Sequence, residues 1–92
     1  MATQEEKLPP PSFSLLVASL GSQAMVALGQ VPNPLDGKTE VRLDLAKHAI
    51  EMLAILEQKT KGNLDAEEAR MLEAVLHQLR MAFVAANPGA KR

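Results

Sequence analysis

The sequence predicts an all-α protein of three helices, in which a helical hairpin is preceded by an N-terminal helix. Apolar residues make up 47% of the 92 residues but aromatic residues only 2%. The apolar residues are mainly Leu, Ala, Val and Met, which favours helices, since sheets are richer in aromatic and β-branched residues. Apolar residues also recur at helical spacing. We place a single helical domain at 12–86, between a disordered proline-rich tail at 1–11 and a frayed end at 87–92.

The first helix is predicted at about 13–28. Ser12 suits its N-cap, and Gly29 suits a left-handed C-terminal position with Pro32 beyond it. This helix is apolar on more than one side and carries small residues at a spacing of four, so the hairpin alone is too small to cover it. We therefore expect self-association, most simply as a homodimer. The candidate contact residues are Phe13, Leu16, Ala18, Leu20, Ser22 and Met25.

Residues 30–42 are predicted to form a connector. Pro32 and Pro34 block a helix, and Asp36-Gly37 is a turn signal. Because this connector is long for a compact helical domain, the first two helices need not be simple antiparallel neighbours. It is interpreted mainly as a shaped linkage across one end of the bundle, with a recognition surface as the alternative.

The second helix is predicted at about 43–60 and the third at 66–86. Asp44 lies in the first turn of the second helix, where it complements the helix dipole, and Gly62 is expected to end that helix at a left-handed position. Asp65 and Glu68 form a capping-box pattern at the start of the third helix. Both helices carry an apolar stripe at helical spacing, so we expect them to pack against each other as a hairpin.

The turn between these two helices is the best candidate for a partner or anion contact. Its candidate residues are Lys59, Thr60, Lys61 and Asn63, which lie just before a helix N-terminus. The alternative is a purely structural turn, because Lys59 and Lys61 also complement the dipole of the second helix and Asn63 can cap. The structural interpretation is preferred, since acidic residues already occupy the start of the third helix.

Composition limits the possible chemistry. The chain contains no cysteine, which excludes disulfides, thiolate metal sites and thiol nucleophiles. No catalytic constellation is visible, so we expect a protein that is not an enzyme and needs no cofactor or metal. His48 and His77 each have carboxylates nearby on their helices, and a metal- or ligand-binding protein is therefore one alternative, although the usual ligand spacing is missing.

Charge and hydropathy point to a soluble protein. The net charge is −1, without blocks of like charge, which does not favour nucleic acid as a partner. A small nucleic-acid- or ribosome-associated factor stays an alternative if a dimer aligns the basic side chains into a stripe; these are Arg42, Lys47, Lys59, Lys61, Arg70 and Arg80. No signal peptide or membrane-spanning segment is predicted, so the expected location is the cytoplasm.

Three sequence blocks carry a family resemblance. They are 8–13 (LPPPSF), 27–34 (ALGQVPNP) and a longer block from 45 to 81 that includes LEQKTKGNL at 56–64. Together they resemble the bacterial family of small helical proteins called domain of unknown function 1844, over about residues 8–84. The resemblance implies a bacterial, cytoplasmic helical protein, and it transfers no catalytic residues. The leading hypothesis is thus a non-enzymatic protein-interaction or scaffold module acting as a homo-oligomer.

Overall fold

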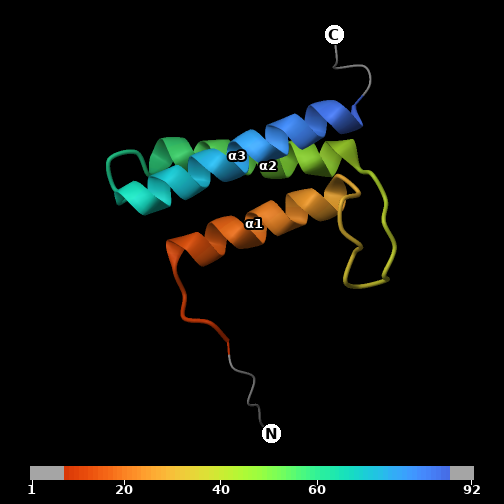
Figure 1. Ribbon diagram of the computed structural model, residues 1–92, viewed down its shortest axis with the longest axis horizontal. Helices are drawn as coiled ribbons and strands as arrows, with labels where there is room; N and C mark the ends of the chain where they lie inside the picture. The colour runs from red at the N-terminus through yellow and green to blue at the C-terminus, as the bar shows by residue number, and fades with distance from the viewer. Residues whose placement is uncertain (1–7, 88–92) are drawn as a thin grey trace, which may run out of the picture.

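The computed structural model describes residues 8–87, which form three helices in a single bundle. These are α1 (Phe13–Ala27), α2 (Leu43–Lys59) and α3 (Ala66–Ala86). Helices α1 and α3 run in the same direction and α2 runs in the opposite one (Figure 1). Within residues 8–87 there is no β-strand, only an isolated antiparallel bridge between Leu28 and Val41. The all-α prediction is confirmed, and each of the first two helices ends one residue earlier than predicted.

The two ends of α1 are closed by local hydrogen bonds. The Ser12 hydroxyl accepts a hydrogen bond from the backbone N–H of Leu15 at 3.0 Å, which makes it the predicted N-cap. At the other end Gly29 has φ +75°, and the Gly29 and Gln30 N–H groups donate to the carbonyls of Val26 and Met25. These two bonds are those of a Schellman motif, so α1 stops at Ala27 because of this motif.

The connector turns back onto the end of α1 before α2 begins. The Arg42 N–H donates to the Ala27 carbonyl at 2.7 Å, next to the bridge between Leu28 and Val41. A Cβ atom on Gly29 would lie only 2.8 Å from Cγ2 of Val41. The connector is thus held against the end of α1 by these contacts. Helices α1 and α2 lie as antiparallel neighbours despite the length of the connector (Figure 1).

The turn between α2 and α3 is held by its own polar groups. Thr60 follows the last residue of α2, and its hydroxyl donates to the Leu56 carbonyl at 2.7 Å. Gly62 has φ +88°, which is the left-handed conformation predicted for it from the sequence. The capping box at α3 is complete: Asp65 accepts from the Glu68 N–H at 2.7 Å, and Glu68 accepts from the Asp65 N–H at 3.0 Å.

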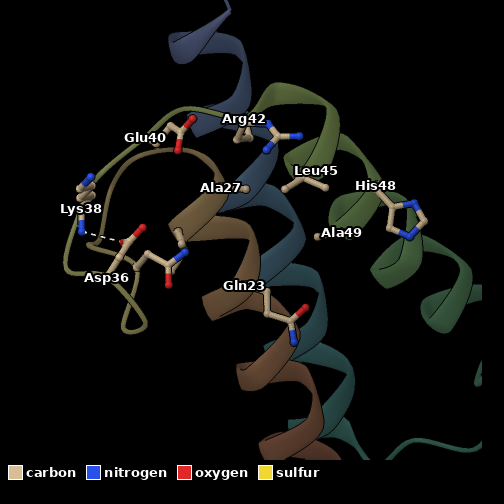
Figure 2. A pocket seen from close by; sticks show the side chains of 11 residues that line it. Gln23, Ala27, Asp36, Lys38, Glu40, Arg42, Leu45, His48 and Ala49 are labelled. Atoms are coloured by element: carbon tan, nitrogen blue, oxygen red, sulfur yellow. Dashed lines mark hydrogen bonds between the residues drawn. The ribbon is translucent and has the colours of Figure 1, made fainter.

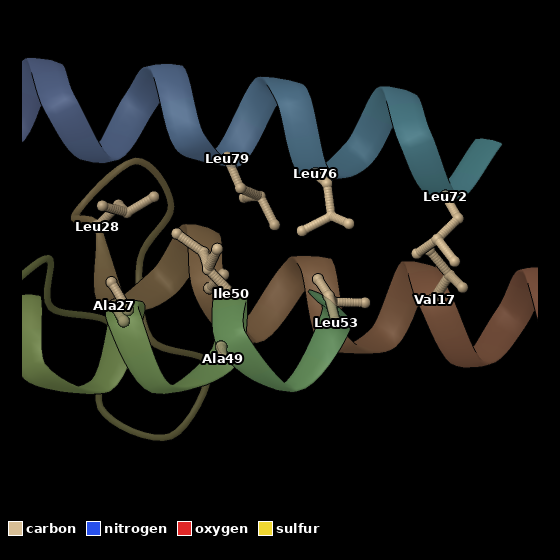
Figure 3. Packing of buried hydrophobic residues seen from close by; sticks show 11 residues of the cluster. Val17, Ala27, Leu28, Ala49, Ile50, Leu53, Leu72, Leu76 and Leu79 are labelled. Atoms are coloured by element: carbon tan, nitrogen blue, oxygen red, sulfur yellow. The ribbon is translucent and has the colours of Figure 1, made fainter. Parts of the chain in front are cut away.

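The core lies where the three helices meet. Leu72, Leu76 and Leu79 point from α3 toward the other two helices, as Figure 3 shows. The remaining buried apolar residues come from α1 with its C-cap and from α2: Val17, Ala24, Ala27, Leu28, Ala46, Ala49, Ile50 and Leu53. No charged or polar side chain within residues 8–87 is buried. The core therefore needs no internal ion pair or hydrogen-bond network.

The predicted tails are described only in part. Residues 8–11 are exposed and belong to no helix, and Asn87 is the C-cap of α3. Residues 1–7 and 88–92 lie outside the described part of the chain, and so does most of the predicted disorder and fraying. Within the described part, no helix combines the length and the apolar character needed to cross a membrane.

Candidate interaction surface

Helix α1 covers one side of the α2–α3 hairpin and leaves its own outward side open. From Leu8 to Leu35 the sequence contains no Asp, Glu, Lys or Arg, so α1 presents no charge on any side. On its outward side Leu15 is 37% exposed, and Ala18 and Ser22 are exposed on the same stripe; Leu16, which is 46% exposed, lies about 100° further around the helix. We call these four residues the α1 surface. Leucines on an exposed helix face without charges are typical of a contact surface.

The six residues predicted for self-association divide into two groups. Leu16, Ala18 and Ser22 are exposed and available to a partner. Phe13, Leu20 and Met25 are half-buried and pack against the core. Leu15 is exposed as well but was not among the predicted contact residues. The hairpin buries the side of α1 that holds Val17 and Ala24, which turns Leu15 outward.

A groove of about 540 Å³ lies between α1 and α3 and shares Ala18 and Ser22 with the α1 surface. At Gly21 the two helices approach closely, because a Cβ there would lie 3.3 Å from Cγ1 of Val75. The connector closes one end of the groove with Val31, Pro32 and Pro34. No lining residue is charged; the full lining is Ala18, Gly21, Ser22, Met25, Val26, Val31, Pro32, Pro34, Met71, Val75, Gln78 and Leu79.

The other side of α1 borders a polar recess that also involves the connector and α2. Asp36, Lys38 and Glu40 lie on one side of this recess, and Gln23 and His48 come from the facing helices (Figure 2). Its lining mixes both signs of charge and contains no buried polar group. The recess therefore lacks the converging, desolvated polar groups that typically fix a small ligand.

One ion pair lies at the start of α2, near this recess. Arg42 contacts Asp44 at 3.2 Å, and both side chains are exposed. The hydrogen bond to Asp44 raises the pKa of Arg42, and the same bond lowers the pKa of Asp44. Arg42 is thus partly neutralised, which weakens its value for a basic stripe.

In the turn after α2, several polar groups of the candidate anion contact already form hydrogen bonds that hold the turn together. The Thr60 hydroxyl is bonded to the end of α2, and the Asn63 N–H donates to the Thr60 carbonyl at 2.8 Å. The start of α3 already holds the carboxylates of Asp65 and Glu68 against backbone N–H groups. Lys59 and Lys61 are exposed. A contact between this turn and an anion or partner stays a prediction.

The other three residues of the predicted basic stripe alternate with carboxylates on the side where α2 meets α3. Arg70 and Arg80 line a shallow recess together with Glu57 and Glu73. Lys47 lines another with Glu51. Such alternation gives a surface of mixed charge and not a continuous basic stripe.

The two histidines lie on different sides of the bundle. His48 lines the recess between α1 and α2, whereas His77 lines one between α2 and α3. The structure therefore does not bring the two histidines together into one site. Among residues 8–87, no group of three or more potential ligand side chains could hold a metal ion.

Comparisons with known proteins give a single finding. The family model described as "Domain of unknown function (DUF1844)" matches residues 10–85. Neither the curated proteins nor the solved structures contained a match to this chain. The matched range includes α1, the connector, α2, the turn before α3 and all but the last residue of α3, and so it spans both the α1 surface and the groove.

Proposed function

Because the chain belongs to the domain of unknown function 1844 family, whose name assigns no activity, we propose a function from the geometry alone: a non-enzymatic interaction module that pairs with a second copy of itself. The α1 surface is the proposed contact. The observation that carries this proposal is an exposed helix face with leucines and no charge. We keep the cytoplasm as the expected compartment.

The two sides of the bundle differ in the free energy that it costs to bury them against a partner. Burying the side where α2 meets α3 would desolvate several charged groups, and that costs free energy unless each charge finds a partner. Burying the α1 surface removes apolar area from water at about 25 cal/mol per Å² and desolvates only the hydroxyl of Ser22. Association through α1 is therefore the less costly choice.

A second copy is the simplest occupant. A partner with charges opposite α1 would lose their hydration without any compensating charge, so the complementary surface has to be uncharged as well. The α1 surface of another copy meets that condition, and a twofold contact needs one patch that complements itself. Ala18 and Ser22 are small and four residues apart, which lets two helices approach closely. A chain of this size also gains stability from oligomerisation.

Light scattering coupled to size exclusion tests the proposal with a matched pair of variants. Ala18→Glu places a carboxylate on the α1 surface, and Ala74→Glu makes the same change at an exposed position of α3. We expect dimers for the native protein and for Ala74→Glu, and monomers for Ala18→Glu, because facing like charges cost several kcal/mol. Circular dichroism checks that all three are folded. A native protein that stays monomeric at every concentration would contradict the proposal.

A further inference from the structure

We propose that the loop tip formed by Pro34 and Leu35 of one copy inserts into the groove between α1 and α3 of the other copy. This inference rests on the proposed self-association and specifies how the two copies engage. Leu35 is 93% exposed, the most exposed of the large apolar residues in the described part of the chain. Pro34, its neighbour, already lines the end of the groove in its own copy.

The loop that carries Leu35 is ordered by its own hydrogen bonds. The Asn33 side chain accepts from the Leu35 N–H at 2.8 Å, and Asp36 accepts in the same way from the Lys38 N–H at 3.0 Å. The Gly37 N–H donates to the Asn33 carbonyl at 2.7 Å, and the Asn33 N–H donates to the Lys38 carbonyl at 2.8 Å. These four bonds span the tip from both sides. Presenting Leu35 to a partner thus costs little further ordering of the loop.

The groove fits an uncharged loop tip. Its walls hold methionine, valine and proline side chains and only two polar side chains, Ser22 and Gln78. Methionines such as Met25 and Met71 adapt their shape to an inserted side chain. The volume of about 540 Å³ is in the range of sites that hold small ligands, and it exceeds the space that one leucine needs. The tip as a whole, with Pro34 and Leu35, is therefore the proposed occupant.

The position of the loop favours a second copy over an unrelated protein. A protruding apolar tip and an apolar groove lie next to each other on the same molecule, and a twofold axis between them lets each tip enter the groove of the other copy. Leu35 cannot fill the groove of its own copy, because it is exposed there. The charge-free part of the sequence ends at Leu35, and Asp36 and Lys38 follow at once. Those two charges would form a polar rim around an apolar contact, as in known interfaces.

Cysteine trapping between separately prepared variants tests the insertion, because the native chain contains no cysteine. Leu35→Cys is mixed with Ser22→Cys or with Gln78→Cys, one from each wall of the groove, and one partner carries a mass tag. His77→Cys is the matched control, since His77 is the exposed neighbour of Gln78 but faces the side where α2 meets α3. Mild oxidation then yields a mixed disulfide only if the two Cα atoms come within about 7 Å in the complex.

We expect the mixed disulfide between Leu35→Cys and at least one groove position to form at least about tenfold faster than with His77→Cys, because only the groove holds the tip in place. Equal rates for both groove positions and the control would overturn the insertion. If the native protein is still a dimer by light scattering in that case, the self-association stands and only its contact is wrong. A monomeric native protein would remove both proposals.

A second measurement uses the dissociation constant of the dimer. Leu35→Ser leaves the fold intact, because the side chain touches little in its own copy. Each dimer buries two such leucines, and burying one leucine is worth roughly tenfold or more in affinity, so Leu35→Ser is expected to raise Kd about a hundredfold. Leu45→Ser, which is half-exposed on α2 and outside the groove, is the control and should leave Kd within about threefold, the change expected when no contact is lost. An unchanged Kd for Leu35→Ser would contradict the insertion.

Discussion

Replacing Gly29 by alanine tests how the connector is fixed to the end of α1. Gly29 has φ +75°, a conformation that costs other residues about 1–2 kcal/mol. A Cβ there would also lie 2.8 Å from Cγ2 of Val41. Because Val41 is 51% exposed, it can yield in part, and the crowding is expected to add about 1–2 kcal/mol. We therefore expect Gly29→Ala to lower the free energy of unfolding by about 2–4 kcal/mol in urea denaturation, the sum of these two costs.

Gly62→Ala is the matched control, since Gly62 has φ +88° but open space around its Cα. Both variants change the unfolded chain equally, so the difference between them reports the contact with Val41. In a Val41→Ala background, Gly29→Ala should cost no more than Gly62→Ala, which gives a coupling of about 1–2 kcal/mol between the two sites. Equal costs for the two glycines in the native background would refute the reasoning. All variants are compared at one protein concentration, because the proposed self-association would add to stability.

Three further predictions concern the core, a helix cap and the one ion pair described. Leu53→Ala removes a fully buried side chain and should lower the free energy of unfolding by about 2–5 kcal/mol in urea denaturation. Asp65→Ala loses the hydrogen bond to the Glu68 N–H and should cost about 1 kcal/mol in the same assay, whereas Asp65→Asn should keep most of it. Arg42 lowers the pKa of Asp44 in the folded chain, so the stability that Asp44 adds is present above its unfolded-state pKa and is lost as the pH falls through the lower folded pKa. Asp44→Asn should therefore shift the urea midpoint slightly at neutral pH and not in acid; an equal shift at both would contradict this.

Features set by neighbouring residues were predictable from the sequence. Ser12 and Asp65 cap their helices as predicted, and Gly29 and Gly62 adopt the left-handed conformation expected after a helix. Each of these depends on hydrogen bonds within a few residues, which residue type and spacing determine. The apolar stripes of α2 and α3 likewise predicted that these helices pack as a hairpin, and Leu53 and Leu76 are buried between them.

The parts that the sequence left open depend on how distant segments pack. The periodicity of α1 does not say which of its apolar sides meets the hairpin, and so the sequence did not separate the exposed Leu16 from the half-buried Phe13 and Leu20. For the same reason the sequence did not show that His48 and His77 lie in different recesses. Which side of α2 is covered by α1 depends on the handedness of the bundle. The groove between α1 and α3 joins residues more than forty positions apart in the chain, such as Gly21 and Val75. A linear pattern cannot show such a feature.

The unequal lengths of the two connections have a consequence for the order of folding. Residues 60–65 join α2 to α3 through a short capped turn, whereas residues 28–42 separate α1 from α2. Closing the shorter loop costs less entropy, so the hairpin is expected to form first and α1 to dock onto it. During synthesis, however, α1 leaves the ribosome before the hairpin exists. The uncharged helix α1 is then exposed until the hairpin forms, and we expect chaperones that bind apolar segments to recognise the nascent chain at this stage.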